Sequence, residues 1–276
     1  IEKDYYVTML LRLLAQRMPY IVFKGGTSLS KCHKVIRRFS EDIDITIDTL
    51  LSQGQKKKIK QAIVESAEEL GMTIENLDET RSRRDYNRYV IAYDSVIPMA
   101  SDALKAAVLL ETSYTAVSFP TVLLPVHSYI GDMMEQEAPD AIEEYNLNPF
   151  EMKVQGIDRT LADKVFAVCD YYLQGKVAKH SRHLYDIYKL LPLVPQDENF
   201  KELVKEVRAV REQSVICPSA LPEANVPELL EKIIKEKAYK QDYDSLTTQL
   251  LEENVPYDTV IATLKKVAES SIFENN

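Results

Sequence analysis

Residues 20–31 read YIVFKGGTSLSK: an apolar run, two glycines, and then residues that favour a helix. The apolar run Tyr20 to Phe23 has the length of a short buried strand. Gly25 and Gly26 carry no side chain and tolerate positive φ, so the backbone can turn there and approach a ligand closely. Unpaired N–H groups at the start of the following helix suit a phosphate. This stretch therefore predicts a strand–turn–helix unit with a phosphate-binding turn.

The helix after the glycines is expected to start at a hydroxyl side chain. Thr27 or Ser28 can cap it by accepting a hydrogen bond from a free backbone N–H, and the helix is predicted to continue to about Ile36. A glycine pair before a helix is also typical of an ordinary strand-to-helix turn. The turn alone therefore does not establish a ligand site.

The next extended segment carries a pair of carboxylates. Asp42 and Asp44 flank Ile43, and the alternation continues with Ile45 and Ile47. Residues two apart in a strand point to the same face, so both carboxylates project together while the isoleucines face the core. Neighbouring carboxylates repel one another unless a cation lies between them. Oxygen ligands favour Mg²⁺, and a carboxylate pair after a phosphate-binding turn is the layout of two-metal phosphoryl transfer.

A third carboxylate completes many sites of this kind, and Glu111 is the candidate. It lies in the strand-like run AVLLETS of residues 107–113. The alternative is a glutamate on a strand at the edge of the sheet, facing solvent. The sequence favours neither, so the predicted metal ligands are Asp42, Asp44 and, as an equal alternative, Glu111.

The composition is that of a globular protein that carries excess negative charge. Of 276 residues, 45% are hydrophobic and 28% charged, and the formal net charge is −9. Such a charge argues against a protein that coats nucleic acid non-specifically. The sequence contains no apolar run of the roughly 18 residues that a membrane-spanning helix needs. Three widely spaced cysteines indicate neither a disulfide framework nor a zinc ribbon, and we expect a cytoplasmic protein with no membrane partner.

Basic residues nevertheless recur near the predicted site. Each group by itself is typical of a solvated helix face, but their recurrence favours a local basic surface that could attract RNA. The groups are Lys31, Lys34, Arg37 and Arg38; Lys56, Lys57, Lys58 and Lys60; Arg81, Arg83, Arg84 and Arg88; and Lys176, Lys179 and Arg182.

The hydrophobic pattern divides the chain near residue 155. Helical spacing covers residues 4–16 and 53–70, and strand-like runs cover residues 86–93, 106–113 and 150–154. From Ile157 onward the pattern is almost wholly helical. The predicted fold class is α+β: a catalytic domain of residues 1–155 with a mixed β-sheet flanked by helices, followed by a helical bundle of residues 156–276.

Several motifs resemble one known family in order along the chain. Residues 24–31 (KGGTSLSK) and 38–44 (RFSEDID) resemble the first motif of the AbiEii/AbiGii-type nucleotidyltransferase toxins, MenT-like members of the DNA polymerase β-like superfamily. Residues 161–164 (LADK) and 182–188 (RHLYDIY) are similar to the family's later lysine and arginine-to-aspartate motifs. The resemblance spans about residues 3–191, and the segment after Leu191 carries no motif that we can assign.

The resemblance implies an enzyme that transfers a nucleotidyl group from an NTP with Mg²⁺ and releases pyrophosphate. In related members the acceptor is the 3′ end of tRNA, and such proteins are commonly toxins of type IV toxin–antitoxin or phage-defence pairs. It therefore also implies an antitoxin encoded nearby and a second domain that completes the active-site cleft.

The same resemblance assigns roles to individual residues. Asp42 and Asp44 would bind the metal ions, and Lys24, Gly25, Gly26, Thr27 and Lys31 form the segment that would hold the NTP. Lys164 would neutralise phosphate charge, unless it is a surface lysine whose stem packs along its helix. Asp186 lies one helical turn after Arg182. It either pairs with that arginine, or caps the domain interface, or orients Lys164 or the nucleotide, and the sequence leaves these alternatives open.

Two other functions remain compatible with these motifs: a kinase-like phosphotransferase acting on a protein or small molecule, and a non-catalytic nucleotide-binding interaction module. No complete Walker loop and no Gly-x-Ser-x-Gly elbow is present, which weakens P-loop and hydrolase readings. The four histidines (His33, His127, His180 and His183) lack metal-ligand spacing, so we expect none to bind a metal.

Overall fold

The computed structural model describes residues 1–40, 42–97 and 105–274. The chain forms two compact units. The first contains Ile1–Lys34 and Ser40–Gln155, and the second contains Val35–Phe39 together with the chain from Gly156 onward. The five residues Val35–Phe39 thus belong to the second unit although the first unit surrounds them in sequence. The hydrophobic pattern did not indicate this excursion.

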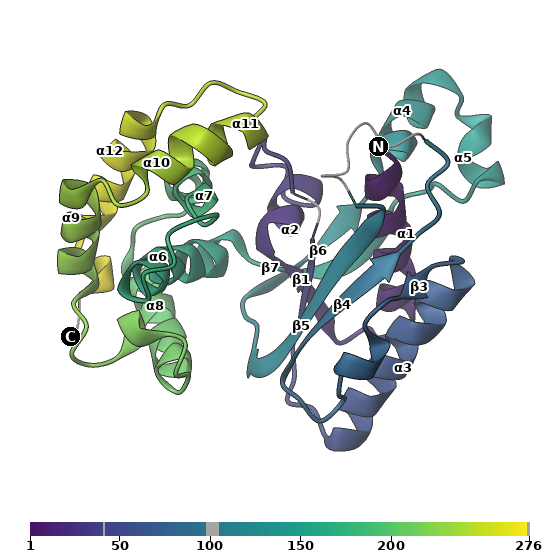
Figure 1. The fold of residues 1–276 in the computed structure, drawn as a ribbon, viewed down its shortest axis with the longest axis horizontal. Coiled ribbons are helices and arrows are strands. Elements are labelled where there is room, and N and C mark those ends of the chain that lie inside the picture. Colours follow the sequence, from purple (N-terminus) through teal and green to yellow (C-terminus); the bar gives the residue numbers. More distant parts are fainter. Residues whose placement is uncertain (41, 98–104, 275–276) are drawn as a thin grey trace. The chain divides into compact units, whose positions relative to one another are not determined.

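In the described part of the first unit, seven strands form a mixed sheet in the order β3-β4-β5-β2-β1-β7-β6 (Figure 1). β1 pairs parallel with β7, β2 pairs parallel with β5, and the remaining neighbours are antiparallel. The strands are β1 (Ile21–Lys24), β2 (Ile43–Ile47), β3 (Thr73–Ile74), β4 (Tyr86–Ala92), β5 (Ala107–Val117), β6 (Thr121–Val126) and β7 (Phe150–Gln155).

Alternation along the central strands separates an apolar face from a polar one. Phe23, Ile43, Ile45 and Leu110 are fully or almost fully buried in the hydrophobic core. Their neighbours in sequence carry the charged groups, because successive strand residues point to opposite faces of the sheet. The predicted period-two pattern is therefore present, and it gathers the predicted metal ligands on one face.

Two helices cover the apolar face of the sheet. Helix α1 (Glu2–Arg17) contributes Leu10 and Leu14 to the core, and helix α3 (Gln53–Glu69) contributes Ile59 and Ile63. In α3, Ser52 and Gln55 form a reciprocal capping box at the N-terminus. The helix ends close to the predicted residue 70, and Gly71, two residues after Glu69, has φ +67°, a conformation that commonly follows the end of a helix.

Helix α2 (Gly25–Lys31) differs from the prediction at both ends. It starts at Gly25, with Lys24 as its N-cap, and makes no side-chain capping bond, so Thr27 and Ser28 lie inside it. It ends at Lys31, well before Ile36, and Lys34 has φ +55°, a left-handed conformation that a continuing α-helix does not contain. The chain then enters the second unit, where Arg38 forms an isolated antiparallel bridge with Leu251.

Parts of the first unit were not predicted from the sequence. Strand β6 contains Pro125, which lacks an N–H, but an edge strand tolerates proline because one side of it needs no ladder bonds. The short β3 and the helices α4 (Tyr129–Glu137) and α5 (Asp140–Glu144) were also not predicted. Two turns of amphipathic pattern are too short to separate from a loop.

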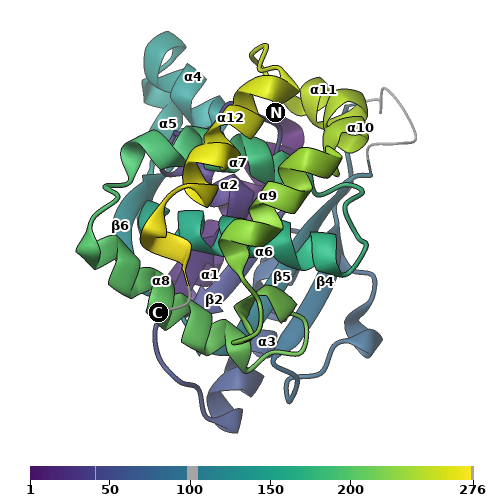
Figure 2. The ribbon, with the colours of Figure 1, turned by 90° about the vertical axis from the view of Figure 1, so that its left-hand side faces the viewer.

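The second unit is helical (Figure 2). Helix α6 (Ile157–Leu173) packs against α7 (Arg182–Leu190), α8 (Glu198–Glu212) and α9 (Val226–Glu236), and α12 (Tyr257–Ala268) packs against α7 and α9. A helical segment from Lys240 to Leu250 comprises α10 (Lys240–Asp242), a π-helical turn (Tyr243–Thr247) and α11 (Thr248–Leu250). Among the described residues, no helix has the length and apolar character needed to cross a bilayer.

Candidate active site

Charged residues form a row across four strands of the first unit. Lys24 of β1 pairs with Asp44 of β2, Asp44 pairs with Glu111 of β5, and Glu111 pairs with Arg88 of β4. Paired residues of neighbouring strands share a face, so the four side chains project from the polar face in register. Glu111 does not lie on an edge strand, because β5 has neighbours on both sides, but its side chain is 36% exposed to solvent.

Gly25 and Asp44 are in direct contact. Gly25 has φ +81°, and a Cβ placed on it would lie 2.0 Å from Asp44 Oδ2. The carboxylate therefore occupies the space that any other residue would fill with its side chain. Glycine is required at position 25 for two independent reasons, because L side chains also disfavour this backbone conformation. The glycine of the predicted phosphate turn and the candidate metal ligand are therefore in contact.

A tyrosine joins the acidic pair from the neighbouring strand. Burial and the adjacent Glu111, to which its hydroxyl donates a hydrogen bond, raise the pKa of Tyr86 to about 12, and Asp44 contributes in the same direction. Arg88 lies on the other side of Glu111, with 3.8 Å between Nε and Oε1. Tyr86 was not predicted from the sequence as a site residue. The only indication is that it lies two residues before Arg88 in β4, and therefore on the same face of the strand.

The donor set fits a hard divalent cation. Asp44 and Glu111 are lateral neighbours on adjacent strands, and Asp42, two residues before Asp44, is expected on the same face. These groups supply only carboxylate oxygens, which Mg²⁺ prefers. Both aspartates are partly exposed, so the carboxylates can reach a ligand from solvent.

Thr27 and Lys31, also predicted to contact the nucleotide, are bound to protein groups. The Thr27 side chain is almost fully buried, and its hydroxyl lies 2.9 Å from the hydroxyl of Ser40. The Lys31 ammonium binds Asp4 and donates to the Thr8 hydroxyl at 3.0 Å and the His127 carbonyl at 3.0 Å. Lys31 is therefore not part of a basic surface, because its ammonium group is buried and bound to these partners.

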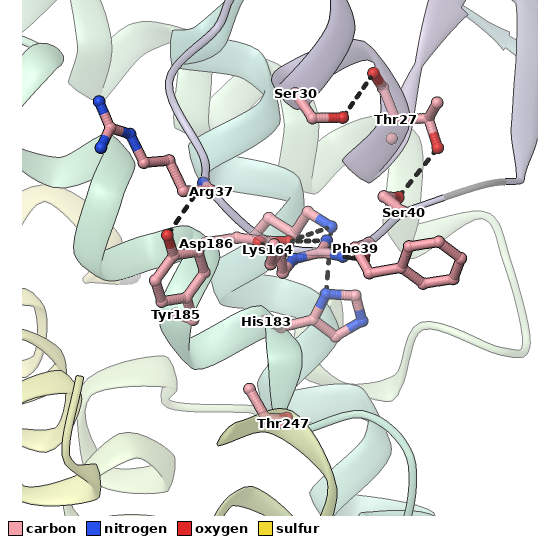
Figure 3. A network of polar contacts seen from close by, with 12 residues as sticks. Thr27, Ser30, Arg37, Phe39, Ser40, Lys164, His183, Tyr185, Asp186 and Thr247 are labelled. Atoms are coloured by element: carbon pink, nitrogen blue, oxygen red, sulfur yellow. Dashed lines mark hydrogen bonds and ion pairs between the residues drawn. The ribbon is translucent and has the colours of Figure 1, made fainter. Parts of the chain in front are cut away.

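The second unit contains a buried ionic network (Figure 3). Asp186 is fully buried and accepts two hydrogen bonds from Arg38, Nε to Oδ1 at 2.7 Å and Nη2 to Oδ2 at 2.9 Å. Lys164 Nζ lies 2.9 Å from Asp186 Oδ2 and 3.1 Å from His183 Nδ1. Lys164 is 8% exposed, which excludes the alternative of a surface lysine.

Burial and charge act in opposite directions within this network. Burial by itself raises the pKa of Asp186, but the charges of Arg38 and Lys164 outweigh it, so the pKa lies well below its usual range. Burial lowers the pKa of Lys164 and Asp186 opposes that shift. Desolvation and the Lys164 charge both lower the pKa of His183 well below its ordinary value. This shift favours the neutral imidazole, whose Nδ1 can accept a hydrogen bond from the Lys164 ammonium.

The arginine that pairs with Asp186 is not the one expected from helical spacing. Among the described residues, the ion pairs of Asp186 are with Arg38 and Lys164, whereas Arg182 was the sequence candidate. Arg38 is 3% exposed, so its assignment to a basic surface group was wrong. It lies 148 residues from Asp186, and no local pattern can indicate such a pair.

Several backbone bonds fasten Val35–Phe39 to the second unit. Phe39 N donates to Leu250 O at 2.8 Å, and Glu252 N donates to Arg37 O at 3.0 Å. Arg37 N donates to the Tyr185 hydroxyl at 3.0 Å (Figure 3). That hydroxyl donates to Glu253. The chain returns to the first unit at Ser40, two residues before Asp42. The predicted metal-binding segment thus directly follows Val35–Phe39, which is hydrogen-bonded to the helical unit. Glu41, which lies within the motif, is outside the described residues.

We expect Gly25→Ala to abolish activity without unfolding the protein. The added methyl group cannot occupy the position of Asp44 Oδ2, so either the turn or the carboxylate must move. Backbone strain of about 1–2 kcal/mol accompanies the change. Gly71→Ala is a matched control, because Gly71 also has positive φ but a Cβ there meets nothing within 4 Å. Circular dichroism melting and a transfer assay of both variants test this; equal activity would contradict it.

Comparisons with known proteins agree with this arrangement. No curated protein matches the sequence. Among solved structures, the chain is similar to MenT4, a nucleotidyltransferase toxin from Mycobacterium tuberculosis H37Rv, with a TM-score of 0.52 and 16% sequence identity over 97% of this chain and 82% of that chain. At this identity the likeness shows a shared fold.

A family model assigns the function more directly. The model described as nucleotidyl transferase AbiEii toxin, type IV TA system, matches residues 9–263, which includes both units and both groups of site residues described above. Nucleotidyltransferases of this kind use an NTP and divalent metal ions. The chain therefore belongs to the AbiEii family and is a nucleotidyltransferase toxin of a type IV toxin–antitoxin system.

Proposed function

We propose that this enzyme transfers a nucleoside monophosphate from an NTP to the 3′ end of tRNA in a Mg²⁺-dependent reaction. The observation that carries the proposal is the contact between Gly25 and Asp44. A phosphate turn and a carboxylate in contact are what a site needs to hold a metal–triphosphate complex. The register neighbour Glu111 adds a second carboxylate beside it.

In this proposal the three carboxylates of Asp42, Asp44 and Glu111, called here the acidic row, bind the cation, and the turn at Gly25 and Gly26 binds the triphosphate. Asp42, Asp44 and Glu111 would hold Mg²⁺, which when bound would supply positive charge that lowers the pKa of the acceptor hydroxyl and stabilises the leaving group. Lys24 and the backbone of Gly25 and Gly26 contact the phosphates. Thr27 binds Ser40 and Lys31 binds Asp4, and these contacts hold helix α2, which follows the turn, in place.

Lys164 and Asp186 are proposed to serve the same reaction from the helical unit. Lys164 neutralises negative charge on the phosphates. Asp186 orients Lys164, since the two are ion-paired at 2.9 Å, and Arg38 and His183 complete the orientation. Accordingly, we propose that residues 1–155 form the catalytic domain and that the helical domain, from residue 156 onward, supplies these groups.

The reaction is a balanced displacement at phosphorus. The 3′-hydroxyl oxygen of the acceptor forms a bond to the α-phosphorus, the bond from that phosphorus to the bridging oxygen breaks, and pyrophosphate leaves with the electron pair. The hydroxyl proton passes to solvent or to a carboxylate of the acidic row. The acceptor is proposed as tRNA because the family acts as toxins, and loss of functional tRNA 3′ ends arrests translation. An antitoxin partner follows from the type IV system.

Labelled nucleotides test both the reaction and the acceptor. The purified chain is incubated with Mg²⁺, total tRNA and each α-³²P NTP in turn, and in parallel with the matching γ-³²P NTP. We expect label on tRNA from one or more α-labelled NTPs and none from γ-labelled NTP. Asp44→Asn serves as the inactive control. EDTA should stop the transfer, and Mg²⁺ should restore it.

The other outcomes identify the rival functions. Transfer of γ-label to a protein or small molecule indicates a phosphotransferase. Absence of both transfer and Mg²⁺-dependent thermal stabilisation by any NTP indicates a non-catalytic interaction module. Transfer of α-label to an RNA other than tRNA keeps the reaction and corrects the acceptor.

A further inference from the structure

A histidine and two carboxylates meet in the first unit away from the acidic row. His127 follows β6, and Asp132 and Glu135 lie on consecutive turns of α4. One ligand atom from each lies within 4.8 Å of the others. His127 Nδ1 is 3.0 Å from Asp132 Oδ1 and 3.9 Å from Glu135 Oε1. The sequence did not indicate this group, and no histidine was expected to bind a metal, because His127 has no histidine or cysteine at ligand spacing.

The orientation of the imidazole suits metal binding. Nε2 lies 2.8 Å from the carbonyl oxygen of Leu147 and donates a hydrogen bond to it, since a carbonyl can only accept. Nε2 therefore carries a hydrogen, and Nδ1 faces the two carboxylates at hydrogen-bond distance from Asp132 Oδ1. In a metal-bound ring with this orientation, Nδ1 would direct its lone pair to an ion held between the carboxylates. Metal-bound histidines usually donate their other N–H to a backbone carbonyl or a carboxylate in this way.

The ring is also held firmly in place. The His127 side chain is 9% exposed, and a Cβ on Gly131 would lie 2.1 Å from its Nε2. Gly131 thus lets the first turn of α4 pack directly on the imidazole. Ser128, the next residue after His127, caps α4 by accepting a hydrogen bond from Gly131 N at 3.0 Å. The cap fixes the helix that carries both carboxylates relative to the ring.

The distances match the ligand shell of a small transition-metal ion. Zn²⁺ binds nitrogen and carboxylate oxygen at about 2.0–2.2 Å in a tetrahedron, which places neighbouring ligand atoms about 3.4 Å apart. The two distances from Nδ1, 3.0 and 3.9 Å, lie on either side of that value. Asp132 and Glu135 are 43% and 53% exposed, so their carboxylates are free to adjust and an ion can enter from solvent.

We propose that His127, Asp132 and Glu135 form a binding site for a Zn²⁺-class ion, separate from the Mg²⁺ site of the acidic row. An imidazole nitrogen with two carboxylates selects a transition metal, whereas Mg²⁺ prefers oxygen ligands alone. Water fills the fourth position. The ion crosslinks the end of β6 to two turns of α4.

The site also lies next to the support of the phosphate turn. The His127 carbonyl accepts a hydrogen bond from Lys31, the last residue of α2. Lys31 in turn binds Asp4, whose other oxygen accepts a hydrogen bond from Tyr129 N at 2.8 Å. Metal binding at His127 therefore stabilises the group of contacts that holds α2, and its expected role is structural.

Metal titration tests the site. Untagged protein, stripped with EDTA, is titrated with Zn²⁺ by calorimetry and with Co²⁺ by visible absorption. We expect one ion per chain outside the acidic row, a Co²⁺ spectrum of four- or five-coordinate intensity, and a raised melting temperature with Zn²⁺. His127→Gln and Asp132→Asn should each weaken Zn²⁺ binding at least tenfold, since even an outer partner of a ligand is worth about 10–100-fold.

Matched variants separate this site from the catalytic one. Glu137→Gln, on the same helix with the same change of charge, should bind Zn²⁺ like the wild type. Asp44→Asn should keep this Zn²⁺ site, and Asp132→Asn should keep Mg²⁺-dependent transfer. Unchanged Zn²⁺ affinity in both His127→Gln and Asp132→Asn would overturn the proposal and leave His127 as an ion-pair partner of Asp132. If either variant fails to fold, an octahedral Co²⁺ spectrum of the Asp44→Asn protein, in which His127, Asp132 and Glu135 are unchanged, would overturn it equally.

Discussion

Asp44→Asn is expected to lower nucleotide transfer about 10³-fold or more while leaving the free energy of unfolding unchanged or slightly higher. A metal-ligand carboxylate supplies several kcal/mol of transition-state stabilisation, and each 1.4 kcal/mol corresponds to a factor of ten in rate. The amide has nearly the same shape, so it still fits against Gly25. Removing one charge from the acidic row also relieves repulsion with Glu111, its neighbour in register.

Asp48→Asn is the matched control for this prediction. Asp48 follows β2 at the other end and pairs with Lys153, so the substitution removes the same charge about 13 Å along the strand. We expect near wild-type transfer and a loss of stability of at most about 1 kcal/mol. Rates at saturating Mg²⁺ and urea unfolding of both variants are the measurements. Equal loss of activity in the two variants would contradict a specific role for Asp44.

Arg38→Ala is expected to destabilise the helical unit by about 3–5 kcal/mol. The substitution removes both hydrogen bonds to Asp186 and leaves that fully buried carboxylate with Lys164 as its remaining ion-pair partner among the described residues. Breaking a buried pair by removing one partner carries the desolvation penalty of the charge that remains. It also releases one of the contacts that fasten Val35–Phe39, so we expect transfer activity to fall as well.

Arg37→Ala tests whether this effect comes from the ion pair. Arg37 is the adjacent residue with the same charge, but it is exposed and the contact it makes with Tyr185 uses its backbone N–H. We expect a change of less than about 0.5 kcal/mol in urea unfolding. In a double-mutant cycle, Arg38→Ala and Asp186→Ala should be strongly non-additive, because both remove the same pair. Additive losses would show that Arg38 acts by packing alone.

The family comparison and the fold agree with the α+β prediction, and the reason is periodicity. Alternation of Ile43, Ile45 and Ile47 with acidic residues determines which face of β2 is buried, so the common face of the carboxylates follows from local pattern. The glycine pair likewise marks a turn from composition alone. These signals depend on neighbours within a few residues, which a sequence displays directly.

The features that were missed depend on distant partners. Helix α2 ends early because Val35–Phe39 joins another unit, and local propensity contains no information about that bridge. His127 becomes a candidate ligand only because α4 folds back onto its ring. Tyr86 meets Glu111 through the register of β4 and β5. Roles in catalysis for Lys164 and Asp186 stay predictions that the proposed assays test.

The sequence by itself determined the strand–turn–helix segment, the paired carboxylates and the family of nucleotidyltransferase toxins, because each depends on short motifs of neighbouring residues and, for the family, on their order along the chain. Only the tertiary structure decided that Asp44 fills the place of a Gly25 side chain, and that Asp186 pairs with Arg38 rather than with Arg182 one turn away. The first outcome follows from the pairing of β1 with β2, which brings Asp44 against the turn after Lys24. The second follows from burial, because a charge removed from water must find its partner in space, whatever the separation along the chain.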